Sequence, residues 1–454
     1  HYENFNLSKG DIANLIYKYG ATDIETFVNM VDNQININGL VNTMRNNNFY
    51  NGKAVFISPN GMVVGSSGVL NVGSLTVLTP DSNSYEKYKS DLKRPSLIAD
   101  YKSKLGEGNA TVKIDGKVLA RNFVDINAAN LQVSPDAQIM AGVKDATKIL
   151  SNTQAEALFN QLVNADNMSA NSFANDNGSI IIRTYGENGG TDIAGTMKNF
   201  GTGSTEITNL GSKGINVSGK LLNGNGDTLL VNKNGEVNVS GTVANKGGKL
   251  LVDNTGSGVL IASTGLLSNQ GGELIVTNTG NDGVSIANGG LVKNSTHSAN
   301  IINSGKNGIN VKGHVNANGI NITNKNSNVI LGDYTGSNNL NSTGNVNIKI
   351  NDGNLLNYGT KETLIKASKN LDIDVQNGMV GQEAGPCDGG VCTGIGPNGR
   401  DLTKSINVNV DGNIKTISTK GTNKSLVNMA SLNNDMRVDQ IKADGSYSSC
   451  RQFN

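Results

Sequence analysis

The chain has 454 residues, a formal net charge of +1, 36% hydrophobic residues and only 4% aromatic residues. It contains 57 Gly, no Trp and about 70 Asn. So few large aromatic side chains disfavour the core of an ordinary globular enzyme. The small charge and the recurrent Ile and Val disfavour disorder, and without a basic stripe the sequence indicates no nucleic-acid partner.

Residues 1–35 are interpreted as an N-terminal cap or docking segment. Within them residues 8–34, SKGDIANLIYKYGATDIETFVNMVDNQ, have a pattern that predicts partly helical structure. The chain begins at His1 rather than Met, as a mature chain without its leader, or a trimmed chain, would begin. No apolar run approaches the roughly 18 to 20 residues of a membrane-spanning helix.

Three short apolar runs separated by tight turns follow in NGKAVFISPNGMVVGSSGVLNVGSL, residues 51–75. Gly and Asn tolerate the left-handed backbone that such corners require. We interpret these runs as three strands that make one coil and the start of the next.

Residues 37–80 resemble the secretion domain of two-partner secretion exoproteins, the filamentous-haemagglutinin-like adhesins of Gram-negative bacteria. The matching elements are Ile37 to Gly39, the turn Ser58-Pro59-Asn60-Gly61, Gly65, Gly68, Val72-Gly73 and Leu78-Thr79-Pro80. Ser58 stands where the family usually has Asn, and both residues cap turns through side-chain to backbone bonds.

The resemblance implies a right-handed β-helix whose N-terminal part is read by an outer-membrane two-partner-secretion transporter. It implies a secreted protein, extracellular or on the cell surface of a Gram-negative-type bacterium. The secretion-domain-like region is expected to extend over residues 36–200.

Two insertions interrupt this region. In residues 81–108, Tyr85, Tyr88 and Leu92 share helical spacing before Pro95 breaks the pattern. We expect a helix there that lies across the flank of the solenoid. This helix either only packs on the solenoid or forms a contact surface for a partner.

The second insertion, residues 151–167, also predicts a helix. Thr153 precedes Glu156 by three residues, as in a capping box. The expected apolar stripe is formed by Ala157, Leu158 and Leu162.

Residues 201–365 repeat a strand that ends in glycine. The repeated positions are Gly219, Gly241, Gly265, Gly289 and Gly313, at intervals of 22, 24, 24 and 24 residues. Period-2 alternation, as in Ile215 and Val217, excludes helical repeats, and the leucine-rich frame is absent. The sequence therefore predicts an all-β fold, a parallel β-helix whose coils stack and whose corner asparagines form amide ladders.

Residues 366–454 are interpreted as C-terminal rungs interrupted by a Gly-rich loop, residues 381–401. Cys387 and Cys392 lie in this loop, and a disulfide between them is the leading interpretation. A metal site would need further soft ligands, and the redox Cys-x-x-Cys spacing is not met. Cys450 is left over, free or available for an intermolecular bond.

Catalysis is the alternative because parallel β-helices also house polysaccharide lyases and hydrolases. Such enzymes need clustered carboxylates and aromatic platforms. Residues 205–330 contain no aromatic residue, and their acids, such as Asp227, Glu236 and Asp253, fall mainly in turns. Neither His297 nor His314 has a nearby Ser and Asp pattern of the kind that a catalytic triad needs. We expect no catalytic residues, no cofactor and no metal.

The sequence therefore favours a secreted structural or adhesive β-helix protein. It is either a surface adhesin that binds a host-cell or matrix receptor, or the subunit of an end-to-end homopolymer. A carbohydrate-active β-helix enzyme is the alternative.

Overall fold

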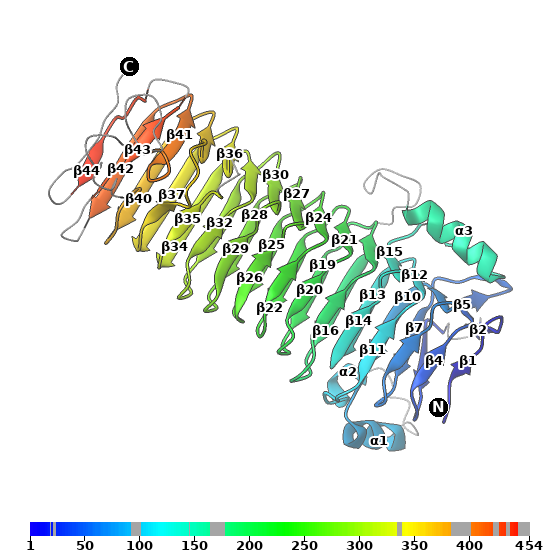
Figure 1. The fold of residues 1–454 in the computed structure, drawn as a ribbon. Helices are drawn as coiled ribbons and strands as arrows, with labels where there is room; N and C mark the ends of the chain where they lie inside the picture. Colours follow the sequence, from blue (N-terminus) through cyan, green and yellow to red (C-terminus); the bar gives the residue numbers. More distant parts are fainter. Residues whose placement is uncertain are drawn as a thin grey trace. The chain divides into compact units, whose positions relative to one another are not determined.

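The chain forms parallel strands wherever apolar and polar residues alternate (Figure 1). The structure is a computed structural model that describes residues 1–18, 20, 24–91, 101–144, 146–163, 178–333, 338–382, 401–420, 426–432 and 436–443. It comprises two compact units. Unit 1 contains His1–Gly235 and Gly241–Gly248, and unit 2 contains Glu236–Ser240 and Lys249–Asn454.

In each unit a coil of the chain contributes one strand to each of three parallel sheets, here called first, second and third in chain order. This arrangement confirms the predicted all-β parallel solenoid. The strands pair in register, so each sheet grows by one strand per coil.

Unit 1 contains the following strands. Its first sheet holds β1 (Asn6–Leu7), β4 (Ile35–Ile37), β8 (Met62–Val64), β11 (Thr111–Ile114), β14 (Asn130–Val133), β17 (Thr191–Ile193) and β20 (Ile215–Val217). Its second sheet holds β2 (Ile12–Ile16), β5 (Leu40–Arg45), β9 (Val69–Val72), β12 (Lys117–Ala120), β15 (Gln138–Ala141), β18 (Thr196–Asn199), β21 (Lys220–Asn223) and β24 (Thr242–Asn245). Its third sheet holds β3 (Thr26–Met30), β7 (Lys53–Ile57), β10 (Ser74–Leu78), β13 (Phe123–Ala128), β16 (Ser179–Thr184), β19 (Thr205–Asn209) and β22 (Thr228–Asn232). The short β6 (Asn48–Phe49) pairs with β5 in antiparallel fashion.

Unit 2 repeats the plan. Its first sheet holds β23 (Val237–Val239), β26 (Gly258–Ile261), β29 (Gly283–Ile286), β32 (Ile309–Val311), β35 (Val329–Leu331) and β38 (Leu355–Asn357). Its second sheet holds β27 (Leu266–Asn269), β30 (Leu291–Asn294), β33 (His314–Ala317), β36 (Leu340–Ser342), β39 (Ile365–Ala367), β41 (Ile406–Val410) and β43 (Met429–Ser431). Its third sheet holds β25 (Leu250–Asn254), β28 (Leu274–Asn278), β31 (Ala299–Asn303), β34 (Ile320–Asn326), β37 (Val346–Asp352), β40 (Leu371–Gln376), β42 (Ile414–Lys420) and β44 (Ile441–Ala443).

The core of each unit is a set of stacked side-chain columns inside the coils. One column of unit 1 runs through the second sheet, with equivalent buried residues at Val41, Leu70, Val118, Ile139, Met197, Leu221 and Val243. Because the side-chain period of a strand is two, the neighbouring residues point outward. A slip of one residue would turn the whole column inside out.

Buried asparagines at the corners join the coils, as the sequence predicts. At the end of the third-sheet strands in unit 2, the Nδ2 of Asn254 donates to the Oδ1 of Asn278 at 2.7 Å. Asn278 donates to Asn303, and Asn303 to Asn324, both at 2.8 Å. All four are at most 1% exposed, so each amide is satisfied by its neighbours rather than by water.

The pairing register corrects one repeat position. Leu291 of β30 pairs with Leu266 of β27 and with His314 of β33. The glycine before Leu291 is Gly290, so Gly290 and not Gly289 is equivalent to Gly265 and Gly313. Gly289 instead has a positive φ of 90° inside the corner between β29 and β30. The extra residue of this coil lies in the corner between β28 and β29, which has four residues where the corner between β25 and β26 has three.

The prediction of helical structure in residues 8–34 is wrong. The described residues of this segment form β2 and β3, which pair in parallel with β5 and β7. The apolar residues Ile12 and Ile16 look helical by spacing, but they are half-exposed on the outer face of β2, and Leu15 alone in this strand is fully buried. Pairing with the next coil overrides the local pattern.

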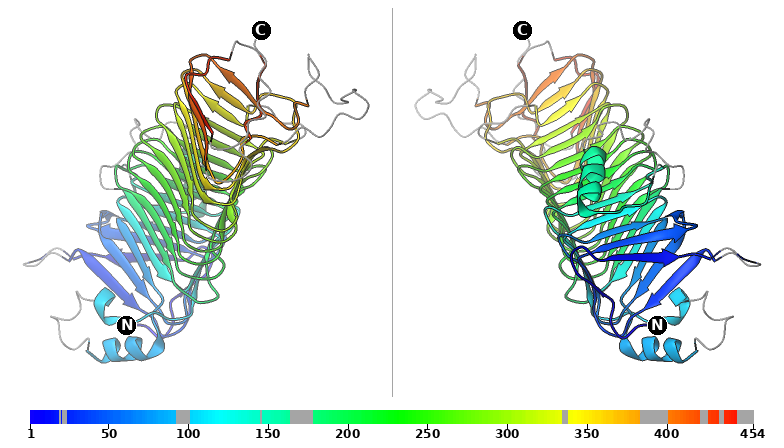
Figure 2. Two further views of the ribbon diagram at one scale, coloured as in Figure 1. Left: turned by 90° about the vertical axis from the view of Figure 1, so that its left-hand side faces the viewer. Right: turned by 90° about the vertical axis from the view of Figure 1, so that its right-hand side faces the viewer.

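Both predicted insertions contain helices that cover unit 1, on different sides of it (Figure 2). The helices α1 (Ser82–Asp91) and α2 (Tyr101–Lys104) pack Tyr85, Tyr88 and Tyr101 on the outer face of the third sheet. Leu92 and Pro95 lie outside the described residues. No helix in the described part of the chain is long and apolar enough to span a membrane.

The third helix, α3 (Asn152–Val163), covers the outer face of the second sheet. Its cap is not the expected pair of Thr153 and Glu156. Instead the Ser151 hydroxyl accepts from the Gln154 amide at 3.2 Å, and the Gln154 side chain accepts from the Leu150 amide at 2.7 Å. This arrangement is similar to a capping box placed two residues earlier, but Gln154 bonds to the amide of Leu150, which precedes the Ser151 cap.

The buried face of α3 also differs from the expected apolar stripe, because packing on the second sheet decides which side chains are covered. Ala155, Phe159 and Leu162 are buried against the sheet. Of the expected stripe only Leu162 is buried, while Leu158 is half-buried and Ala157 is exposed.

The ladder predicts a large cost for removing one buried amide. Asn278→Ala removes the buried side-chain bonds of Asn278 to Asn254 and Asn303 and its bonds to the amide and the carbonyl oxygen of Gly280, at 3.2 and 2.8 Å. We expect a loss of about 2 to 4 kcal/mol, measured by urea unfolding and by hydrogen exchange of β28 and β31. Asn321→Ala is the matched control, because Asn321 bonds to Asn300 and Asn347 on the outer face. Equal losses for the two variants would contradict a special role for the buried ladder.

The cap of α1 predicts a pH-dependent contribution. The Asp81 carboxylate accepts from the Ser84 hydroxyl at 2.6 Å and from the amides of Ser84 and Asn83, and these bonds lower its pKa below the ordinary value. The charged form is favoured in the folded state, so its stabilisation is present above the ordinary pKa of 3.8 and disappears as the pH falls through the lowered value.

Asp81→Ala should therefore lose about 1 kcal/mol of unfolding free energy at pH 7, and this difference from the wild type should shrink below pH 4. Urea unfolding at pH 7 and pH 3 measures it. Asp81→Asn keeps an acceptor and serves as the control, with a smaller loss at pH 7. A difference between Asp81→Ala and the wild type that is equal at both pH values would contradict the role of the carboxylate.

Candidate functional site

The turn Ser58-Pro59-Asn60-Gly61 lies at the corner between β7 and β8. The Ser58 hydroxyl donates to the backbone oxygen of Asn33 at 2.9 Å and accepts from the Asn60 amide at 3.1 Å. Serine therefore caps this turn, as expected for a residue in the place of Asn. Gly61 has a φ of 83°, and a Cβ there would lie 2.3 Å from the Thr111 oxygen, so this position requires glycine.

The same turn is bonded to the preceding coil. The Asn60 side chain donates to the backbone oxygen of Asp32 at 2.7 Å. The Asp32 carboxylate in turn accepts from the Tyr85 hydroxyl and the Lys89 ammonium of α1, each at 2.9 Å, and lies 2.8 Å from the ring of His1. Burial and then the bond to Asp32 raise the pKa of Tyr85. The turn, the first coil and α1 thus form one connected surface.

Residues 51–75 form one coil and the beginning of the next, as the sequence predicts. The strands β7, β8 and β9 belong to three different sheets, and β10 returns onto β7, with Leu75 opposite Ala54. The Gly-Ser-Ser-Gly turn makes the corner between β8 and β9, and there the Gly68 amide donates to the Gly65 oxygen at 2.8 Å.

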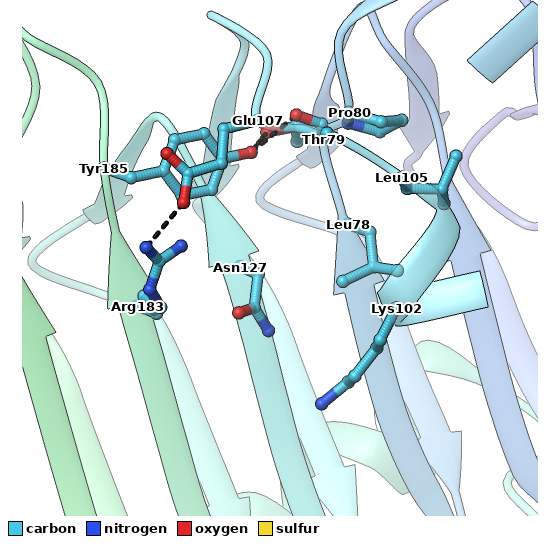
Figure 3. Close-up of a pocket in the computed structure, with 10 residues that line it drawn as sticks. Leu78, Thr79, Pro80, Lys102, Leu105, Glu107, Asn127, Arg183 and Tyr185 are labelled. Carbon is cyan, nitrogen blue, oxygen red and sulfur yellow. Dashed lines mark hydrogen bonds and ion pairs between the residues drawn. The ribbon is translucent and has the colours of Figure 1, made fainter. Parts of the chain in front are cut away.

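The insertion at 81–108 builds a cleft of about 320 Å³ against the outer face of the third sheet (Figure 3). The cleft floor is a column of outward residues from three successive coils. Leu78 of β10 pairs with Asn127 of β13, which pairs with Arg183 of β16. The walls come from Lys102 of α2 and from the segment that follows this helix.

Two ion pairs border the cleft. The Arg183 guanidinium lies 2.5 Å from the Glu107 carboxylate. The Lys102 ammonium donates to the Asp125 carboxylate, which also accepts from the Asn127 side chain at 2.7 Å. Side-chain exposures of 37%, 51% and 54% for Arg183, Glu107 and Lys102 leave these groups open to a ligand, whereas Asp125 is 7% exposed.

An aromatic ring stands at the end of the cleft. The Tyr185 hydroxyl donates to the backbone oxygen of Thr79 at 2.6 Å and lies 2.9 Å from the Thr79 hydroxyl. Burial raises the pKa of Tyr185, so this hydroxyl stays protonated at neutral pH. Pro80 and Glu107 form an isolated antiparallel bridge beside it, which fixes the exit and the return of the inserted segment.

A second, more open cleft of about 380 Å³ lies between the turn Ser58-Pro59-Asn60-Gly61 and the start of α1. Its lining includes Pro59, Asn60, Asp81 and Glu107. Glu107 borders both clefts, so the turn at 58–61 and the insertion at 81–108 share one face of unit 1.

The first coil presents sheet edges. Among the described residues, β1, β2 and β3 each end their sheet and have a paired neighbour on one side only. Ile12 and Ile16 of β2 are 43% and 52% exposed. Inside the coil the ring of Phe5 contacts that of Phe56 at a centroid distance of 5.5 Å and covers the end of the core.

The remaining sequence candidates do not converge on a chemical site. Cys387, Cys392 and Cys450 lie outside the described residues. His297 is in an exposed turn, and the Nδ1 of His314, at the start of β33, lies 3.3 Å from the Asn338 oxygen. The described residues hold no group of three or more His, Cys, Asp or Glu side chains that could bind a metal ion.

One pair of acids comes together across coils. Burial and then the charge of Asp282 raise the pKa of Glu236, although the two residues are far apart in the sequence. Asp227 and Glu273 lie in turns as expected, and Asp253 lies on β25.

Sequence reasoning missed the cleft residues Asn127, Arg183 and Tyr185. They come from β13 and from the end of β16, and only the insertion at 81–108 signalled that this face differs from the rest. No protein-family model, no curated protein and no solved structure matches the chain.

Proposed function

We propose that the chain is a secreted structural and adhesive β-solenoid without a catalytic step, exported through an outer-membrane two-partner-secretion transporter. The observation that carries the proposal is the position of the turn Ser58-Pro59-Asn60-Gly61 in the second coil from the start. There it is partly exposed and is bonded to the first coil, whose Asp32 is in turn bonded to α1. A receptor that reads the first coils of an emerging chain would meet this turn early.

The solenoid itself supports an adhesive role. Buried columns and amide ladders hold the coils, so the outward side chains are free to vary without loss of the core. In unit 1 this outer surface carries helical insertions and a cleft, which are the features that contact a receptor.

A filament subunit is the second candidate, and the edges of β1, β2 and β3 favour it. An open parallel edge is a template for another strand. The exposed Ile12 and Ile16 beside that edge would be buried by a second copy. A carbohydrate-active enzyme ranks below both, because the acids of the repeats are mostly dispersed in turns.

Export tests the role of the turn. In cells that express the transporter, Pro59→Ala and Asn60→Ala should reduce the secreted fraction at least about tenfold if the turn is read directly. Ser66→Ala changes an exposed residue in the next corner, between β8 and β9, and should be secreted normally. Thermal unfolding of the purified variants checks that their fold is retained. Normal secretion of folded Asn60→Ala, or secretion without any transporter, would overturn the proposed route.

Edge blocking tests the filament. The Leu40 amide bonds to the Asp11 oxygen, and the Tyr17 amide to the Met44 oxygen. In a parallel ladder the backbone of Asn14 therefore faces away from β5, toward the open edge. Asn14→Pro removes the amide hydrogen that a second copy would use, and Asn14→Ala keeps it.

Electron microscopy should then show fibres of the wild type and of Asn14→Ala, and single particles of Asn14→Pro. Single particles in all three samples would exclude the filament subunit and leave the monomeric adhesin as the remaining candidate. Fibres of Asn14→Pro would exclude this edge as the contact. Deleting residues 1–35 is a weaker test, because it would expose the edges of β5 and β7 instead.

A further inference from the structure

We propose that the cleft between α2 and the third sheet of unit 1 binds a neutral sugar residue at the exposed end of a glycan. This inference rests on the proposed adhesive function and names the ligand class of that function. The cleft is built by Lys102, Glu107, Asn127 and Arg183, with Leu78 on its floor (Figure 3).

The size of the cleft fits a single ring. Small-molecule pockets range from about 300 to 1,000 Å³, and this cleft, at about 320 Å³, is at the lower end. It lies on the outer face of the sheet and not in the core, so a ring at the end of a longer chain can enter while the rest stays in solvent. The partly exposed Leu105 and Tyr185 provide apolar surface for the C–H groups of the ring.

The charges of the cleft favour a neutral ligand. Its two cations, Arg183 and Lys102, are each paired with an acid, Glu107 and Asp125. The four formal charges sum to zero. An acidic ligand would have to compete with a carboxylate already in place at each cation, so an anion gains little from this site.

The same two ion pairs that disfavour a charged ligand are suited to the hydroxyl groups of a sugar. A sugar hydroxyl donates one hydrogen bond and accepts others, and the Arg183–Glu107 pair presents donors directly beside acceptors. Arg183 has five N–H donors, and Glu107 is the ion-pair partner that the structure shows for it. The Asn127 amide between the two ion pairs donates to Asp125, and its carbonyl oxygen is an acceptor on the cleft floor.

The polar groups are also held in place before binding. Asn127 and Arg183 stand on adjacent paired strands, and the bridge between Pro80 and Glu107 anchors the wall. Ligand binding therefore orders few additional groups, which is the condition for useful affinity in a small site.

A glycan array probed with the intact chain tests the proposal. The wild type should bind neutral glycans that share a terminal sugar. Arg183→Gln and Asn127→Ala should weaken that binding at least about tenfold, which corresponds to about 1.4 kcal/mol. Lys113→Gln is the matched control and should bind as the wild type does, because Lys113 is a half-exposed cation paired with Asp115 at 3.0 Å on the first sheet. Thermal unfolding confirms that each variant is folded.

Each other result overturns the inference. Binding of acidic glycans only would exclude the ligand class, and undiminished binding by both cleft variants would exclude the site. No binding to any glycan would exclude both the ligand class and the site. Adherence of whole cells to a surface coated with the chain is measured in parallel. Adherence without glycan binding leaves the adhesive function standing, whereas glycan binding without adherence removes the adhesive function and not the cleft.

Discussion

The structure depends on the strict register between successive coils. Each coil adds one strand to each of three sheets, so the same kind of side chain must return to the same place every time. Buried asparagines enforce this return, because the amide of Asn278 can bond to Asn254 and Asn303 only when both neighbours are aligned. A misaligned coil would leave buried amides without partners, at a cost that apolar packing alone would not impose.

With the core held in this way, the outer faces are free to differ between coils. In the third sheet of unit 1 the outward positions are apolar at Met30, Ile57 and Leu78, and α1 and α2 cover them. The next two residues of the same column are the polar Asn127 and Arg183, and the helices no longer cover the sheet there. The cleft lies where the column changes from apolar to polar, so it is a consequence of how far the insertion reaches.

The first coil combines two properties in one place. Its strands end the three sheets, and its corner at Asp32 bonds to the turn at Asn60 and to α1. The proposed export and the proposed assembly would therefore use neighbouring surfaces. A transporter that held this turn would lie beside the strand edges with which a second copy would pair.

The sequence by itself determined the repeating fold, because strand alternation and Gly or Asn corners are local signals that recur every coil. The alternation predicts that the side chains of Ile215 and Val217 point into the core, and both are buried. Only the tertiary structure decided the register at Gly290, the buried face of α3 and the cleft. In regular coils bonded asparagines are 21 to 25 residues apart, but Leu78, Asn127 and Arg183 are separated by 49 residues (78 to 127) and 56 residues (127 to 183). Insertions of that length carry no period, so the contacts they create depend on where the chain re-enters the sheet.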